Sequence, residues 1–124
     1  MNLSEKQAAF SHSIVRFLRE QFPDRGGAVR VTEDYTYRYR LSYCERDPIG
    51  NRAVGGHPKS THLSRLAQDI IIDRRRNDMS RWIVLPGKDP LWKELHDDWE
   101  TIYGGSRMIQ GDPGHFSFEH NGVR

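Results

Sequence analysis

Two of the six histidines in this chain stand near carboxylates at spacings that could support chemistry. His62 precedes Asp69 by seven residues, and His115 follows Asp112 by three. Among the other histidines, two stand in predicted helices and are interpreted as surface or core-edge residues, and two have no obvious partner (His12 and His96, then His57 and His120). His62 and His115 are therefore the two histidines most suited to a chemical role.

Asp69 lies at the start of a run of three isoleucines, so we expect its carboxylate to be partly buried. A buried carboxylate needs a cation, a metal or several hydrogen-bond donors, because leaving it unpaired is costly. A fully extended chain would separate His62 from Asp69 by about 20–25 Å. Sharing a metal therefore requires residues 62–66 to turn back.

The segment Asp112-Pro113-Gly114-His115 predicts a type II turn, because proline and glycine occupy its two central positions. Such a turn brings the Cα atoms of its first and last residues within about 7 Å of each other. A carboxylate would then stand beside an imidazole at the start of a strand. A plain tight turn with a capping aspartate explains the same residues equally well.

Together the two segments supply two imidazoles and two carboxylates. Cys44 is the only cysteine, which excludes a multi-thiolate metal site and an internal disulfide. Two histidines and one carboxylate with an open fourth position form a catalytic zinc arrangement, and zinc lowers the pKa of a water there to about 7. The remaining carboxylate could serve as the general base.

These motifs resemble the zinc D-Ala-D-Ala carboxypeptidase and L-alanyl-D-glutamate endopeptidase family, and most closely its small phage endolysins. The family pattern is Ser-x-His, then Gly-x-Ala-x-Asp, and later Asp-x-x-His-Phe after a Gly-Gly pair. The matching residues follow in the same order and the similarity continues to the end of the chain: Ser60-Thr61-His62, Ala67-Gln68-Asp69, Gly104-Gly105, Asp112 to Phe116 and Ser117 to Gly122.

The resemblance implies roles for these residues one by one. It makes His62, Asp69 and His115 the ligands of a Zn²⁺ ion, and Asp112 the catalytic base. It also implies an α+β fold, with a small antiparallel sheet and packed helices, of the Hedgehog/DD-peptidase-like type. Residues 1–124 would form a single zinc peptidase catalytic domain.

The substrate contacts implied by the resemblance are less closely matched. The family places an arginine upstream to hold the scissile carbonyl or a substrate carboxylate, and we assign this role to Arg38, with Arg40 as the alternative. Ser60 of the Ser-x-His motif would also contact the substrate. Arg65 stands where the family usually has glycine.

By this resemblance the protein is a zinc-dependent peptidase that hydrolyses the peptide stems of bacterial peptidoglycan. The L-alanyl-D-glutamate and D-Ala-D-Ala bonds both remain open as substrates, as does a soluble peptide or dipeptide. A non-catalytic, zinc-containing binding module of the same fold is a further alternative. We expect a monomer that stays in the host cytoplasm until a separate pore releases it to the cell wall.

Composition fits this interpretation and argues against others. The length of 124 residues suits one domain, and the formal net charge of +2 with both signs mixed gives no basis for nucleic-acid binding. No stretch is long and apolar enough for a membrane span, and the first residues lack the apolar region of a signal peptide. The run Arg74-Arg75-Arg76 predicts a solvated turn, with contact to an anionic polymer as the alternative.

The elements that must position these residues follow from periodicity. A capping box of Ser4 and Gln7, with a Leu3–Ala8 staple, predicts the start of a helix that runs to about Phe22. Asp89 and Pro90 predict the start of a second helix, which Gly104-Gly105 would end. Strands are predicted at residues 28–32, 66–73, 83–85 and 115–119, whereas residues 35–43 suit either a strand or a helix.

Overall fold

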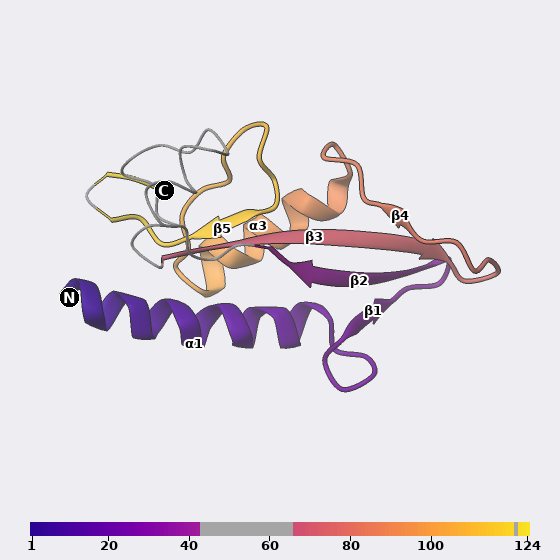
Figure 1. Ribbon diagram of the computed structural model, residues 1–124, viewed down its shortest axis with the longest axis horizontal. Helices are drawn as coiled ribbons and strands as arrows, with labels where there is room; N and C mark the ends of the chain where they lie inside the picture. Colours follow the sequence, from indigo (N-terminus) through magenta and orange to yellow (C-terminus); the bar gives the residue numbers. More distant parts are fainter. Residues whose placement is uncertain (43–65, 121) are drawn as a thin grey trace.

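The computed structural model describes residues 1–42, 66–120 and 122–124 and shows a small α+β fold (Figure 1). These residues form two helices and a five-stranded antiparallel sheet, joined by loops. The elements are α1 (Leu3–Gln21), β1 (Val29–Val31), β2 (Tyr35–Leu41), β3 (Ala67–Arg76), β4 (Ile83–Val84), α3 (Pro90–Ile102) and β5 (His115–Ser117). The predicted α+β class with an antiparallel sheet is confirmed, and residues 35–41 form a strand.

Strand β3 is the centre of the sheet. It pairs with β2 along one edge, and the other edge holds β5 near the N-terminal end of β3 and β4 near its C-terminal end. Alternate side chains of β3 therefore point to two different faces. Ile70 and Ile72 face the core, and Asp69, Ile71 and Asp73 face the other way, on what we call the outer face.

Both helices pack on the inner face of the sheet and share one core with it (Figure 1). Apolar side chains of both helices supply much of this core, in which aromatic rings predominate around the fully buried Trp99 and Phe17. The core side chains are Phe10, Ile14, Phe17, Leu18, Phe22, Leu66, Ile70, Ile72, Leu85, Leu91, Trp92, Leu95, Trp99 and Phe116. Within the described residues, neither helix is long and apolar enough to cross a bilayer.

The two helix starts differ in how well the sequence predicted them. Asp89 caps α3 as predicted, with its side chain accepting from the Leu91 N–H. The predicted cap of α1 is wrong, because the capping box is formed by Asn2 and Glu5 instead. The Asn2 side chain accepts from the Glu5 N–H at 2.8 Å, and Glu5 reaches back to the Asn2 N–H at 3.2 Å. Ser4 therefore lies within the helix.

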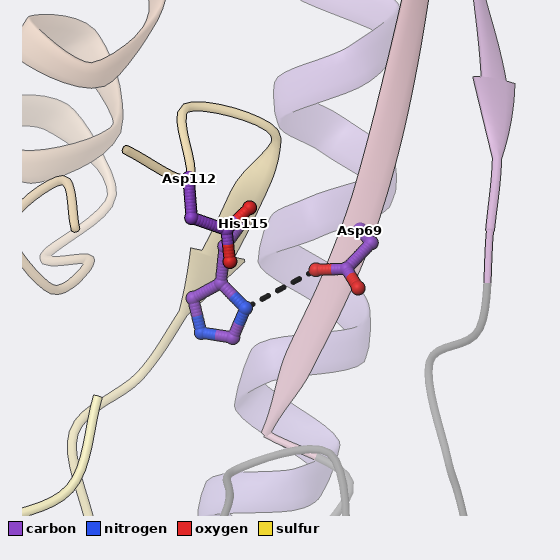
Figure 2. A group of neighbouring side chains, drawn as sticks. All are labelled: Asp69, Asp112 and His115. Carbon is purple, nitrogen blue, oxygen red and sulfur yellow. Dashed lines mark hydrogen bonds and ion pairs between the residues drawn. The ribbon is translucent and has the colours of Figure 1, made fainter. Parts of the chain in front are cut away.

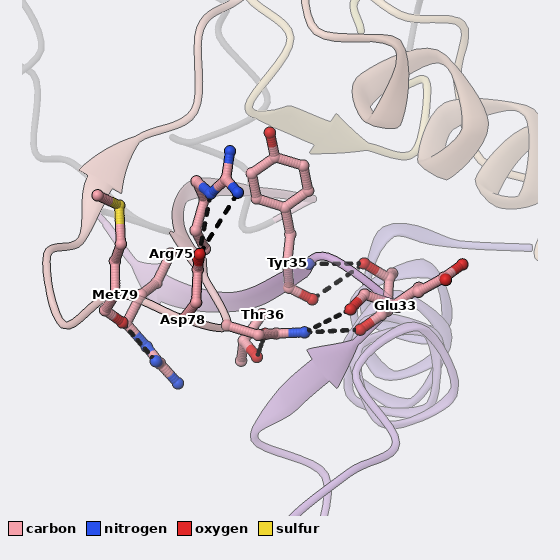
Figure 3. Close-up of polar contacts among 9 residues, drawn as sticks. Glu33, Tyr35, Thr36, Arg75, Asp78 and Met79 are labelled. Carbon is pink, nitrogen blue, oxygen red and sulfur yellow. Dashed lines mark hydrogen bonds and ion pairs between the residues drawn. The ribbon is translucent and has the colours of Figure 1, made fainter.

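The predicted solvated turn at Arg74-Arg75-Arg76 is also wrong, since these residues are the last three of β3. Arg74 lies against the Tyr35 ring and pairs with Asp89 at 2.9 Å. Arg75 donates to the carbonyl of Met79 in the turn that follows, in the region shown in Figure 3. The pairing of all three with residues of β2 keeps the strand extended beyond the isoleucine run.

Candidate metal centre

Strands β3 and β5 place Asp69 and His115 side by side, because their register pairs these two residues. Paired residues of antiparallel strands point to the same face. His115 Nδ1 lies 3.1 Å from Asp69 Oδ1, as Figure 2 shows. The His115 side chain is buried, whereas that of Asp69 keeps 27% of its surface exposed. The pair therefore offers one imidazole and one accessible carboxylate.

Asp112 completes a group of three. One ligand atom from each of Asp69, Asp112 and His115 lies within 4.8 Å of the others (Figure 2). Asp112 is the exposed member, at the start of the turn that leads into β5. Two carboxylates this close to each other repel, and a cation between them relieves the repulsion.

The turn before His115 forms with a different conformation from the predicted one. The His115 N–H donates to the Asp112 carbonyl at 3.2 Å, as in a β-turn. Gly114 is not among the glycines with positive φ, which a type II turn would require. The type II prediction is therefore wrong, although the turn itself lies where the sequence placed it.

The glycine at position 114 is needed for close packing. A Cβ built on Gly114 would lie 2.4 Å from the carbonyl oxygen of Ile70. The Ile70 N–H in turn donates to the Gly114 carbonyl at 2.8 Å. Since any side chain here would push β3 and the turn apart, Gly114 lets the backbone bring His115 to Asp69.

The Asp69–His115 geometry fits a metal ion. Zinc binds nitrogen and carboxylate oxygen at about 2.0–2.2 Å in a tetrahedron, which places two ligand atoms about 3.3–3.6 Å apart. The observed 3.1 Å between Nδ1 and Oδ1 is close to that spacing. A hydrogen bond joins the two atoms, so metal binding at Nδ1 would displace the proton between them. The residues can hold a metal.

The predicted third ligand, His62, is not among the residues that the structure describes. Ser60 and Arg65 are also outside the described residues. The assignments of His62 as a zinc ligand and of Ser60 as a substrate contact therefore stay predictions. Of the predicted metal and catalytic residues, the structure brings together Asp69, Asp112 and His115.

The two candidate arginines meet on one carboxylate that the sequence did not single out. Asp73 is 3% exposed and accepts from Arg38 Nε at 2.9 Å. It also accepts from Arg40 Nε at 2.8 Å and from Arg40 Nη2 at 2.9 Å. The hydrogen bond from Arg40, then that from Arg38, lowers the pKa of Asp73 against the opposing effect of burial. One buried carboxylate thus holds two half-exposed guanidinium groups.

These arginines share the outer face with Asp69 but differ in distance from it. Arg38 is paired in register with Asp73, and Arg40 with Ile71. At about 3.3 Å per residue along a strand, Asp73 is about 13 Å from Asp69 and Ile71 about 7 Å. The backbone of Arg40 therefore lies nearer the metal-binding group than that of Arg38, the preferred choice from sequence, although both guanidinium groups reach to Asp73.

Trp82 extends this outer face away from the metal-binding group. The guanidinium carbon of Arg38 lies 4.2 Å from the centre of the Trp82 ring, and that of Arg75 lies 5.2 Å from it. Neither Trp82 nor Asp73 was predicted from the sequence as a site residue. A signal for Asp73 existed, since it stands four residues after Asp69 and alternation puts both on one face of a strand.

No model of a known protein family, no curated protein and no solved structure matches this chain. Its function therefore has to be inferred from the residues and their geometry.

Proposed function

We propose that this protein is a zinc-dependent peptidase that hydrolyses the stem peptides of bacterial peptidoglycan, as an L-alanyl-D-glutamate endopeptidase of the phage endolysin type. The observation that carries the proposal is the grouping of Asp69, Asp112 and His115 within 4.8 Å. These are the residues to which the resemblance assigns two zinc ligands and the base. The α+β fold suits the Hedgehog/DD-peptidase-like type, to which we assign the chain.

Asp69 and His115 would hold the ion together with His62. When bound, zinc polarises a peptide carbonyl and lowers the pKa of water. His115 is buried and fixed by strand pairing, so its ring can accept a metal with little loss of side-chain freedom. Asp69 supplies the anionic charge that favours a cation at this position.

Asp112 is the proton carrier in this proposal. Its carboxylate is exposed and lies beside the Asp69–His115 pair, where water and a peptide can reach it. As general base it takes a proton from the water that attacks the peptide carbonyl carbon. The C–N bond then breaks, and Asp112 returns a proton to the leaving amine nitrogen. The net reaction adds one water across one peptide bond.

Arg38 and Arg40 would orient the substrate on the outer face. Stem peptides carry free carboxylates, and a guanidinium group binds a carboxylate with two parallel hydrogen bonds. Asp73 neutralises only one of the two positive charges, which leaves the pair cationic overall. Both guanidinium groups contact Asp73, so they would hold a substrate carboxylate beside that residue, on the same face as Asp69.

Digestion of purified peptidoglycan tests the proposal. The zinc-supplemented protein should release new amino termini without new reducing sugars, and mass spectrometry of the fragments should place the cut between L-Ala and D-Glu. Asp112→Asn is the matched control, expected to lower the rate by about 10²–10⁴-fold. Loss of terminal D-Ala would identify the carboxypeptidase instead, reducing ends would identify a glycosidase, and no cleavage would favour the binding module.

A further inference from the structure

Helix α3 contacts the segment around β5 through two ring N–H groups. His96 Nε2 lies 2.7 Å from the carbonyl oxygen of Pro113, and Trp99 Nε1 donates to the carbonyl of Ser117 at 3.1 Å. The two side chains are three residues apart, so they lie on one face of the helix. They hold the two ends of a segment that has His115 in its middle.

His96 is more deeply placed than the sequence suggested. It is 2% exposed, and its ring is stacked on Phe116 with centroids 4.1 Å apart and planes 9° apart. The interpretation as a surface or core-edge histidine is therefore wrong. Burial lowers the pKa of His96, against a hydrogen bond to Pro113 that raises it. The neutral ring is thus favoured.

The contact with Pro113 also fixes which nitrogen carries the proton. A carbonyl oxygen only accepts hydrogen bonds, so Nε2 must be the donor. In the neutral ring, Nδ1 then carries a lone pair, and it is buried with no partner among the residues that the structure describes. An unsatisfied buried nitrogen costs stability. Packing alone would not require a histidine here, and the one polar contact that its ring makes with the described residues is to the turn.

Pro113 is a central residue of the turn that carries the metal-binding group. It stands directly after Asp112 and two residues before His115. Its ring also lies against Gly87, on the loop before α3. The orientation of the Pro113 carbonyl fixes the peptide plane that joins it to Gly114, and hence the path of the chain into His115.

We propose that His96 is a positioning residue, which donates from Nε2 to the Pro113 carbonyl and so holds Asp112 and His115 in their orientation for metal and substrate. The inference rests on the proposed function for the metal it names. Partners that orient ligands from outside a metal site typically change metal affinity by about 10–100-fold when they are removed.

Two variants separate the hydrogen bond from the packing. His96→Phe keeps an aromatic ring against Phe116 but removes the donor, and His96→Gln keeps an N–H at a similar reach but loses the ring. Leu95→Val is the control for general core loss, because Leu95 is 1% exposed on the same helix. If His96→Phe does not fold, His96→Leu takes its place.

Zinc affinity, measured by competition with a chelator, is the first readout. We expect about tenfold weaker binding in His96→Phe, and binding within about threefold of wild type in His96→Gln and Leu95→Val. Unchanged zinc affinity in His96→Phe would overturn the inference. Equal weakening in His96→Phe and His96→Gln would also overturn it, because only ring packing would then matter.

Hydrogen exchange of the His115 amide in metal-free protein is the second readout. This amide donates to Asp112 within the turn, so it should exchange at least tenfold faster in His96→Phe and near the wild-type rate in His96→Gln. Wild-type protein that fails to bind zinc would contradict the proposed function, while the exchange rates would still decide whether His96 positions the turn. Equal exchange in all variants would show that it does not.

Discussion

The Asp69–His115 pair and the Arg38–Asp73–Arg40 cluster lie on the same face of β3 but are held in place differently. Backbone pairing brings Asp69 to His115, and a glycine with no room for a Cβ permits the approach. The arginine heads are instead held by one carboxylate, through side-chain hydrogen bonds at a half-exposed surface. The first region is therefore fixed by backbone pairing, and the second depends on the Asp73 carboxylate, with the Trp82 ring as a further contact of Arg38.

This difference separates two functions that can be tested apart. Changes to the backbone near Gly114 should affect metal binding and the fold together. Changes at Asp73 should affect how substrate is held and leave metal binding intact. Variants that break one region without the other therefore show whether the two act independently.

Gly114→Ala should have the largest effect. Its Cβ would meet the Ile70 carbonyl oxygen at 2.4 Å, so β3 and the turn must separate. We expect at least about 100-fold weaker zinc binding and a lower melting temperature, measured by chelator competition and calorimetry. Gly87→Ala is the matched control, because its Cβ would make only an ordinary 3.5 Å contact with Pro113. Similar behaviour of the two variants would contradict the role of close approach.

Asp73→Asn should have the next largest effect, and on substrate rather than metal. An amide cannot accept the two parallel hydrogen bonds of Arg40 while balancing its charge. We expect a loss of about 1–3 kcal/mol in the free energy of unfolding and a raised KM for wall fragments, with unchanged zinc affinity. Asp78→Asn removes a largely exposed partner of Arg76 and should change neither the free energy of unfolding nor KM. Zinc loss in Asp73→Asn would show that the two regions are coupled.

The acid stability of the protein should depend on the same carboxylate. The folded-state pKa of Asp73 is below its ordinary value of 3.8, chiefly through the hydrogen bond from Arg40. Its contribution to stability is therefore complete above about pH 4 and is lost as the pH falls further. Between pH 5 and pH 2.5, the melting temperature of the wild type should fall more than that of Asp73→Asn. Equal falls in the two melting temperatures would show that Asp73 does not contribute to the loss of stability in acid.

The smallest effect is expected far from both regions, at the start of α1. Asn2→Ala removes the observed cap and should cost about 1 kcal/mol of unfolding free energy. Ser4→Ala, at the position that the sequence pointed to, should cost much less, because Ser4 lies inside the helix. Neither variant should change zinc binding. Chemical denaturation of both would show which residue is the cap.

Local signals in the sequence predicted much of the fold and part of the site. Periodicity and capping residues predicted both helices, and the Pro-Gly pair predicted the turn between Asp112 and His115. The contact of Asp69 with His115 joins residues 46 positions apart, and no local pattern states the register of β3 and β5. That contact was reached only through the resemblance.

The errors have physical causes of the same kind. Arginines favour turns only weakly, and pairing with β2 overrides this tendency at Arg74 to Arg76. Ser4 and Gln7 have the spacing of a capping box, but Asn2 and Glu5 have the same spacing two residues earlier. It is Asn2 and Glu5 that form the box. Gly114 is needed for the close approach of Ile70, and the sequence around the turn does not contain that distant contact.

Zinc binding to the purified protein tests the central claim most directly. Titration with a chelator-buffered zinc series should show one ion per chain for wild type and for Asp112→Asn, because the Asp112 carboxylate is proposed to act as base and not as a zinc ligand. Asp69→Asn and His115→Ala should bind at least about 100-fold more weakly, with circular dichroism showing that each variant is folded. Equal zinc binding by wild type and both ligand variants would contradict the account, as would a wild-type protein that binds no zinc.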